Sequence, residues 1–397
     1  MRRHAASSGG TTHLAPAGGD SVPEQTLVTP HRGLRMRAAV LNSQPGQLDL
    51  EDLRIDGPGP DEVLIEVKGA GLCHSDLHFM EGIFRTKLPS VLGHESAGIV
   101  EAVGDNVTYV KPGDHVICCV SIFCGQCRQC LSGNPHRCNN PAATSRPKGA
   151  PPRLTKQDGT AVDQFARLGG FAEQMLIHQN GVVKIVDEMP LDRAALIGCG
   201  ITTGMGAVFR TAKVPPGASV CVIGAGGIGL AAVQAARIAG AVQVIVVDVA
   251  DDKLEIARQL GGSHVVNATK VDNVVEAVKE LSDGGVDYSF EAIGLKATSE
   301  QAFNMLGLGG TATVIGMVPS KQMLEIRGID LLQEKKLQGS MMGSNQFRTD
   351  MPNMVSMYLD GRLKLDEMVS ATLTFDQINE GYAAMKRGEV TRQVIVF

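Results

Sequence analysis

The stretch SVCVIGAGGIGLAAVQAARIAGAVQVIVVD, residues 219–248, decides the fold of this chain. Its apolar runs SVCVIG and VQVIVVD are typical of buried strands, and the segment between them carries apolar residues at helical spacing. A strand, a glycine-rich turn, a helix and a second strand in this order form a βαβ unit. The sequence therefore predicts a parallel sheet covered by helices.

The turn in this unit has the spacing of a dinucleotide-binding loop. Gly224, Gly226 and Gly229 fit GxGxxG, although a glycine-rich turn without a ligand is the alternative in a chain with 47 glycines. The first glycine permits a tight turn, the second lets the backbone approach a pyrophosphate, and the third lets the helix pack on the strand. The second strand ends on Asp248, where an acidic residue binds the adenosine ribose hydroxyls. Because a carboxylate there repels a 2′-phosphate, the sequence favours NAD over NADP.

Four further runs predict strands that complete this sheet: HVVN, VDYSFEAI, TATVIG and KKLQGSMM. Helical patterns in DDKLEIARQLGG and NVVEAVKEL lie between them, as crossovers require. We therefore predict a six-stranded, doubly wound Rossmann domain over residues 201–341. The segment before it has short β-type runs punctuated by Gly and Pro, which predicts a mainly-β domain over residues 36–200. Residues 342–397 close with RQVIVF and are expected to return to that first domain.

Composition narrows the class of protein. The 397 residues include 37 Lys+Arg and 42 Asp+Glu, with a formal net charge of -5. We find neither an apolar run of about eighteen residues nor a basic block, so we expect no membrane span and no nucleic-acid partner. Residues 1–35 are rich in Ser, Gly, Thr and Pro and are predicted to be a disordered tail outside the fold. A targeting signal is the alternative, although Asp20 and Glu24 do not suit a transit peptide.

Four of the nine cysteines lie in one short segment, CGQCRQCLSGNPHRC. In a large chain without a secretory signal, this spacing indicates reduced thiols that hold a metal. Four thiolates can surround one zinc ion tetrahedrally and leave no open position, which is typical of a structural site. An iron–sulfur cluster is the alternative, but the CP ending of ferredoxin-like runs is missing. Fortuitous clustering of unliganded cysteines is the third reading. The predicted structural zinc ligands are Cys124, Cys127, Cys130 and Cys138.

Three more possible ligands are dispersed along the chain. Cys73 lies in GLCHSDLHF, His94 in GHE and Cys199 in GCG. Two thiolates and an imidazole match a catalytic zinc, which keeps its fourth position for water or substrate. Spacing alone does not bring these residues together, because a buried Cys is usually a small apolar residue and a His beside Glu is often a structural pair.

The motifs taken together resemble a known family. GLCHSDLH, GHESAGIVEAVG, the four-cysteine segment, GCGITTG, GAGGIG and FDQINEGYAAMKRGEVTRQVIVF resemble the zinc-dependent alcohol dehydrogenases of the medium-chain dehydrogenase/reductase superfamily. The resemblance runs from about Met36 to Phe397 and implies a GroES-like catalytic domain. The insert between Cys138 and Cys199 resembles that of the dimeric liver-type group. The resemblance to that group implies a homodimer, with a homotetramer as the alternative. We also expect the protein to be cytoplasmic.

The resemblance also implies roles for residues around a catalytic zinc held by Cys73, His94 and Cys199. Glu95 would lie close behind the metal. Asp76 would accept the other ring proton of His94 and fix its tautomer. For the reaction itself, Ser75 would hydrogen-bond the alcohol oxygen and His78 would complete a proton relay to solvent. Two zinc ions per subunit are expected, one catalytic and one structural.

For the cofactor, the resemblance implies a set of residues along the bound NAD. Gly227 belongs to the pyrophosphate turn, and Thr203 and Ile228 would press the nicotinamide into place. Lys253 would lie near the adenosine ribose and Arg392 at the pyrophosphate. His74 stands where many members carry an Arg, and a histidine with an ordinary pKa near 6.5 is only partly charged at neutral pH. We therefore expect NAD affinity to strengthen from about pH 8 to pH 6.

Three residues are expected to shape the substrate pocket. Val120 occupies a position that is often aromatic in the family, and Phe84 one that is usually aliphatic. Phe165 lies in the long insert and is assigned to the pocket with them. A wider inner pocket with a bulkier wall would accept branched, cyclic or aryl alcohols.

The leading hypothesis is therefore an enzyme that transfers a hydride between an alcohol and NAD, giving an aldehyde or ketone. Zinc would acidify the bound alcohol so that it can lose hydride near neutral pH. Two alternatives within the family are a dehydrogenase of thiol adducts of formaldehyde and a nicotinoprotein that holds its NAD permanently. A catalytically inactive dinucleotide-binding protein is the alternative from another class, but such proteins typically lose the metal ligands.

Overall fold

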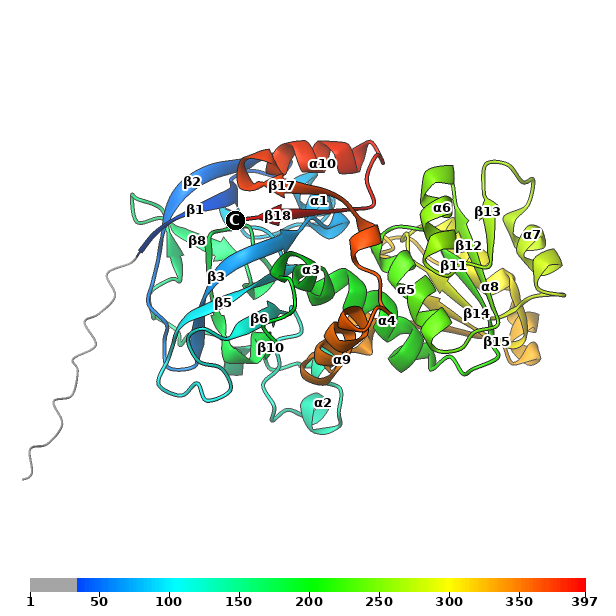
Figure 1. Ribbon diagram of the computed structural model, residues 1–397, viewed down its shortest axis with the longest axis horizontal. Helices are drawn as coiled ribbons and strands as arrows, with labels where there is room; N and C mark the ends of the chain where they lie inside the picture. The colour runs from blue at the N-terminus through cyan, green and yellow to red at the C-terminus, as the bar shows by residue number, and fades with distance from the viewer. Residues whose placement is uncertain (1–33) are drawn as a thin grey trace, which may run out of the picture. The chain divides into compact units, whose positions relative to one another are not determined.

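The computed structural model describes residues 34–397, which contain every predicted site residue (Figure 1). Most of the predicted tail, residues 1–33, lies outside the described residues. The first strand begins at Leu34, just before the expected start at Met36. Residues 34–397 form one compact unit.

The first part of the described chain is mainly β. Within it, five short strands close into a barrel in the order β1-β2-β7-β8-β4, and a larger sheet runs β10-β6-β5-β3-β18-β17, with β9 also paired to β3. The strands of this part are β1 (Leu34–Leu41), β2 (Leu48–Ile55), β3 (Glu62–Gly71), β4 (Ser90–Val91), β5 (Ser96–Val103), β6 (His115–Cys118), β7 (Leu154–Thr155), β8 (Ala161–Gln164), β9 (Gln174–His178) and β10 (Val182–Lys184). Short helices interrupt them: α1 (His74–Met80) and α2 (Arg128–Leu131).

The second part contains the predicted Rossmann sheet. Among the described residues, six parallel strands lie in the order β13-β12-β11-β14-β15-β16, so the strands after β13 are added on the other side of β11. The strands are β11 (Ser219–Ile223), β12 (Gln243–Asp248), β13 (His264–Asn267), β14 (Val286–Glu291), β15 (Leu306–Val314) and β16 (Lys336–Gly339). The crossover helices are α5 (Gly227–Ile238), α6 (Asp251–Gln259), α7 (Val274–Leu281) and α8 (Lys296–Asn304). This order confirms the predicted doubly wound sheet, and ligands of such sheets bind beyond the carboxyl ends of the strands.

Helices and a returning strand join the two parts. A helical run passes from α3 (Leu191–Leu196) through α4 (Thr202–Gly206), and α9 (Phe347–Leu359) lies further along the chain. The end of the chain returns to the mainly-β part through β17 (Val369–Thr374), α10 (Ile378–Lys386) and β18 (Arg392–Val396). Strand β18 pairs antiparallel with the end of β3 (Figure 1), and β3 ends two residues before Cys73. This pairing places Arg392 beside the first predicted zinc ligand.

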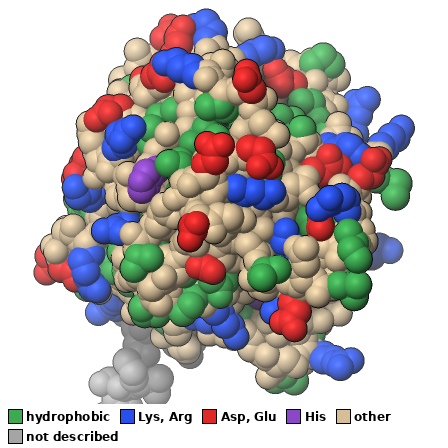
Figure 2. All heavy atoms as spheres, turned by 90° about the vertical axis from the view of Figure 1, so that its right-hand side faces the viewer, with side chains coloured by type: hydrophobic (Ala, Val, Ile, Leu, Met, Phe, Trp, Pro, Cys, Tyr) green, Lys and Arg blue, Asp and Glu red, His purple; other side chains and the backbone are tan. Residues whose placement is uncertain are grey.

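Apolar burial follows the same division. One cluster fills the mainly-β part, while another surrounds α3, α4, α5 and α9 and reaches the strands β11 and β12. On the face shown in Figure 2, Lys and Arg side chains are interspersed with Asp and Glu, as is usual for a soluble surface. Within residues 34–397, no helix is both long and apolar enough to cross a membrane.

Candidate active site and metal centres

The three dispersed ligands meet in space. Cys73 is the N-cap of α1, His94 lies between β4 and β5, and Cys199 lies in the helical run between α3 and α4. One ligand atom from each of these residues, and one from Glu95, lie within 4.8 Å of one another, and all four residues are buried. Two thiolates and an imidazole in this arrangement fit a zinc ion with a further position free for substrate.

Outer contacts orient this cluster. The Asp76 carboxylate lies 3.1 Å from Nδ1 of His94 and also accepts a hydrogen bond from the backbone N–H of Gly93 at 3.1 Å. Nδ1 therefore faces the carboxylate, and Nε2 is left to bind the metal. The Glu95 carboxylate pairs with the buried Arg392 guanidinium. This pairing directs the Glu95 carboxylate toward Arg392.

Protonation in the cluster indicates a place for a cation. A hydrogen bond from Cys199 lowers the pKa of Cys73, which burial alone would raise. Burial would lower the pKa of His94, but Asp76 and Cys73 raise it well above its usual value. Two thiols and an imidazole thus lie close enough to share hydrogen-bonded protons, and a zinc ion bound by these candidate ligands would replace those protons.

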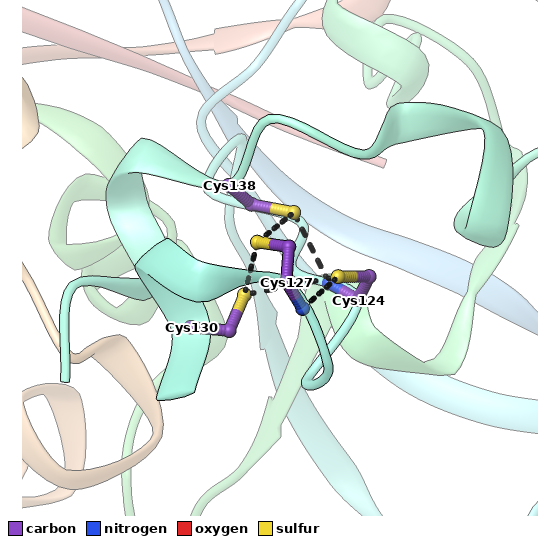
Figure 3. A group of neighbouring side chains, drawn as sticks. All are labelled: Cys124, Cys127, Cys130 and Cys138. Atoms are coloured by element: carbon purple, nitrogen blue, oxygen red, sulfur yellow. Dashed lines mark hydrogen bonds between the residues drawn. The ribbon is translucent and has the colours of Figure 1, made fainter. Parts of the chain in front are cut away.

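The four-cysteine segment forms a second centre, shown in Figure 3. Its four side chains converge, with Sγ–Sγ distances of 3.9 Å for Cys124 and Cys130, 3.5 Å for Cys127 and Cys130, and 3.9 Å for Cys127 and Cys138. Zinc–sulfur bonds of about 2.3 Å in a tetrahedron put the sulfurs about 3.8 Å apart. The distances therefore fit one zinc ion, and they are far too long for a disulfide.

The glycine-rich turn has the expected geometry. Gly224 has a φ of +99°, which an L side chain rarely adopts, and a Cβ at Gly229 would overlap the carbonyl oxygen of Gly224. Gly226 has open space where a Cβ would stand, at the N-terminus of α5. A pyrophosphate fits such a helix start because the backbone N–H groups point toward it. Asp248 ends β12 and accepts a hydrogen bond from Ala225 N at 2.7 Å, so it borders the same turn.

The other predicted cofactor residues gather near this turn. The Arg392 side chain lies against Gly227, where a Cβ would overlap it. His74 is the first residue of α1 and keeps an exposed side chain; partial desolvation lowers its pKa, the Cys73 thiolate opposes this, and the positive charges of Arg392 and Lys253 lower it further. Thr203 is buried and directs its hydroxyl to Met342 Sδ at 3.6 Å, while the carbonyl of Ile228 lies against Gly204.

Aromatic rings stand beside His94. The Phe165 ring lies 5.8 Å from the His94 ring and 4.5 Å from the Phe79 ring, and Phe79 lies 5.8 Å from Phe84. The Phe84 ring is also 5.8 Å from the ring of His78. Two of the three predicted pocket residues are therefore brought together near the predicted metal.

Val120 is half-buried and, like Phe165, packs against the core of the mainly-β part. Its place in the substrate pocket stays a prediction.

Two residues near the site were not predicted. Phe79 joins Phe84 and Phe165, and the sequence signal was available because Phe79 lies four residues after Ser75 and thus on the same side of α1. Met317 follows β15 and accepts the Ser75 hydroxyl at 3.7 Å through its sulfur. Its position just beyond the carboxyl end of a Rossmann strand is where ligand-contacting residues are expected.

Family models match both parts of the chain. The model described as "Alcohol dehydrogenase GroES-like domain" matches residues 59–187, and the model described as "Zinc-binding dehydrogenase" matches residues 227–359. S-(hydroxymethyl)glutathione dehydrogenase of Paracoccus denitrificans is 37% identical over 376 residues, which are 92% of this chain and 100% of that protein. The chain belongs to the zinc-dependent alcohol dehydrogenase family.

Other members of the family agree. The NDMA-dependent alcohol dehydrogenase of Amycolatopsis methanolica is 38% identical over 91% of this chain and 99% of that protein. The crystal structure of benzyl alcohol dehydrogenase from Acinetobacter calcoaceticus has a TM-score of 0.84 and 34% identity, covering 92% of this chain and 99% of that one. An alcohol dehydrogenase zinc-binding domain protein from Burkholderia ambifaria has a TM-score of 0.88 and 35% identity over the same shares.

These findings confirm the predicted family, fold class and reaction class. This alcohol dehydrogenase is an NAD-dependent, zinc-containing enzyme that interconverts an alcohol and its carbonyl product. The reading as an inactive dinucleotide-binding protein has no support in these relatives.

Proposed function

We propose that the catalytic zinc is held by Cys73, His94 and Cys199, and that Ser75 orients the alcohol beside it. The observation that carries this assignment is that the ligand atoms of these buried residues converge within 4.8 Å of one another. Ser75 lies on α1, two residues after Cys73. Cys124, Cys127, Cys130 and Cys138 would hold the structural zinc. Residues 36–200 and 342–397 would form the catalytic domain, and residues 201–341 the NAD domain.

Each polar residue near the substrate would have a defined task. Cys73, His94 and Cys199 would hold a zinc ion that supplies the acidity the bound alcohol needs, and NAD in its domain would supply the hydride acceptor. Ser75 is partly exposed on the first turn of α1, so its hydroxyl can accept the alcohol proton and pass its own proton onward. Nδ1 of His78 is buried without a hydrogen-bond partner among the described residues, so it is available to continue the relay.

The substrate is proposed to be an aryl or cyclic alcohol. The rings of Phe79, Phe84 and Phe165 form a group beside His94, with Phe79 4.5 Å from Phe165 and 5.8 Å from Phe84 between ring centroids. A flat ring would gain contact with such a group beyond its simple burial, because aromatic pairs favour offset and tilted packing. The likeness to a benzyl alcohol dehydrogenase is in keeping with this choice.

A screen of NADH formation tests the substrate. The enzyme would be assayed with ethanol, cyclohexanol, benzyl alcohol and a terpenoid alcohol, and with formaldehyde in the presence and absence of glutathione. We expect kcat/KM for benzyl alcohol to exceed that for ethanol by about a hundredfold, the upper range for apolar pocket contacts. Equal values for the two alcohols would contradict the aromatic-pocket proposal.

Two family alternatives have support from relatives. Activity that requires glutathione would favour a thiol-adduct formaldehyde dehydrogenase, as the relative from Paracoccus denitrificans is named. NADH absorbance that stays with the protein after gel filtration would favour a nicotinoprotein. The similarity to an NDMA-dependent enzyme makes this second measurement worthwhile.

A homodimer is the proposed assembly. Strand β16 is the last strand of the Rossmann sheet, so among the described residues its outer edge has no partner strand. Large apolar side chains are exposed in β15 and in the segment between β15 and β16, and a second copy of the chain would cover them: Leu308, Met323, Ile329, Leu331 and Leu332. Light scattering should give a dimer mass, and L332D should lower the mass toward a monomer. A tetramer mass would support the alternative assembly.

A cytoplasmic location is also proposed. All nine cysteines, which lie within the described range, are free thiols in the structure, and both proposed zinc sites need reduced cysteines. Fractionation of cells that express the chain tests this proposal.

A further inference from the structure

Arg167 occupies an unusual position between the two proposed zinc sites. It ends the short helix η3 (Phe165–Arg167), two residues after the ring that lies 5.8 Å from His94. Its guanidinium donates to Thr144 Oγ1 at 2.7 Å and to the Ile122 carbonyl at 3.3 Å. Ile122 stands just before the first of the four cysteines, and Thr144 stands shortly after the last. One side chain therefore holds both ends of the four-cysteine loop.

The backbone around Arg167 is strained in a way that requires support. Ala166 has a φ of +53° and Arg167 a φ of +62°, both in the left-handed region that L residues rarely adopt. Such conformations persist only where surrounding contacts fix them. The segment is held on its other side as well, because Gly170 N donates to the carbonyl of Gly93, next to His94, at 2.8 Å. Arg167 thus anchors one end of a strained turn whose other end is tied to the His94 loop.

The charge of Arg167 has no carboxylate partner. Within residues 34–397 it forms no ion pair, although it is only partly exposed. Burial lowers the pKa of Arg167, and the nearby Cys138 thiol opposes that effect. A zinc ion with four thiolates carries a net charge of about -2, which a neighbouring guanidinium would offset. The negative charge of the four-cysteine loop with bound zinc would therefore balance the positive charge of Arg167.

We propose that Arg167 is a positioning residue that couples the two metal sites: it closes the four-cysteine loop around its zinc and fixes Phe165 against His94. The structural zinc then helps to shape the substrate pocket. This inference rests on the proposed assignment of the four cysteines as a zinc site and of Phe165 as pocket wall.

Zinc release tests the first half of the inference. R167Q removes the positive charge but keeps a polar side chain, while R167K keeps the charge but loses the several N–H donors of the guanidinium. R137Q, which removes an exposed positive charge next to Cys138, is the control. A colorimetric chelator should draw one of the two zinc ions from R167Q about tenfold faster than from the wild type or R137Q, in the range seen for outer contacts of metal ligands. R167K should release zinc at an intermediate rate. If R167Q does not fold, the comparison of R167K with R137Q decides the question.

Substrate kinetics test the second half. R167Q should raise KM for the best aryl or cyclic alcohol about tenfold while KM for ethanol changes less than twofold, because ethanol has much less apolar surface to place against the Phe165 ring. Zinc release from R167Q at the wild-type rate would overturn the inference. Faster zinc release from R167Q with unchanged KM values would overturn the coupling between the zinc site and the pocket. A wild-type enzyme with fewer than two zinc ions would instead show that the zinc assignment itself is wrong.

Discussion

Asp76 and His94 form a buried pair in which both carboxylate oxygens lie 3.1 Å from Nδ1 of the imidazole. The backbone N–H of Gly93 donates to the same carboxylate. The carboxylate therefore fixes both the tautomer and the direction of the His94 ring.

We predict that D76N weakens catalytic zinc binding by about ten- to a hundredfold, as for other outer contacts of metal ligands. The asparagine amide oxygen can still accept a hydrogen bond from Nδ1 of His94, so a loss of zinc affinity would report the missing negative charge and not a change in side-chain shape. Competition with a zinc chelator measures the affinity, with D105N, a change at an exposed site, as the control. An unaltered affinity in D76N would remove the orienting role.

Met317 should influence which alcohols bind, because its sulfur lies 3.7 Å from the Ser75 hydroxyl. The backbone of Met317 packs closely against Gly294, because a Cβ added at Gly294 would lie 2.7 Å from Met317 N. This packing fixes the position from which the Met317 side chain extends. M317A should improve kcat/KM for branched secondary alcohols relative to ethanol by about tenfold, the effect of one or two methylene groups. V242A, a change at a side chain that is 69% exposed and lies between α5 and β12, serves as the control. Identical substrate ratios in M317A and V242A would count against the role.

Asp248 should determine the preference for NAD. Its two oxygens accept hydrogen bonds from Ala225 N at 2.7 Å and from Val249 N at 2.8 Å, so the carboxylate stays at the end of β12. D248N keeps an acceptor but loses the charge that repels a 2′-phosphate. We expect the ratio of kcat/KM for NAD to that for NADP to fall about tenfold, a difference of about 1.4 kcal/mol. A ratio that does not change would show that other groups exclude NADP.

Glu62 should stabilise the fold in a pH-dependent way. It is 4% exposed, and its carboxylate accepts from Arg146 Nε at 3.0 Å and from Arg153 Nε at 2.7 Å. Burial alone would raise the pKa of Glu62, but these arginines and Gly59 N lower it below 4.5. The stabilisation is therefore complete above about pH 4.5 and is lost as the pH falls through the lower, folded-state pKa.

We predict that E62Q lowers the free energy of unfolding at pH 7 by about 3 kcal/mol, because two partly buried arginines lose their partner. Urea denaturation at several pH values measures this difference. The gap between E62Q and wild type should narrow only below pH 4.5. A gap that is constant down to pH 3 would contradict the assigned cause.

The Rossmann half was predictable because each strand is an apolar run bounded by turn residues and each helix has its own apolar spacing. The strand around TATVIG is longer than predicted and begins at Leu306, since GLGG hides its first part. The run KKLQGSMM is shorter as a strand, because the chain turns at Met342, where φ is +49°. In both places the local conformation depends on glycines and turns that apolar patterns do not record.

The catalytic cluster could not be assembled from spacing. Cys73, His94 and Cys199 come from a helix start, a loop and a helical run that only tertiary packing brings together. The four-cysteine site was predictable because all its ligands come from one short loop. The Ser75–Met317 contact was not predictable, because it joins a residue of the mainly-β part to one that follows a Rossmann strand. Contacts of this kind leave no periodic pattern in the sequence. The predicted increase of NAD affinity on acidification through His74 stays a prediction.

Zinc content measured together with activity tests the central claim most directly. Elemental analysis of the purified wild type should give two zinc ions per chain, and C73A should keep one zinc ion, remain folded and form no NADH from any alcohol. C73A that keeps two zinc ions, or that turns over alcohol at the wild-type rate, would contradict the assignment of the catalytic metal.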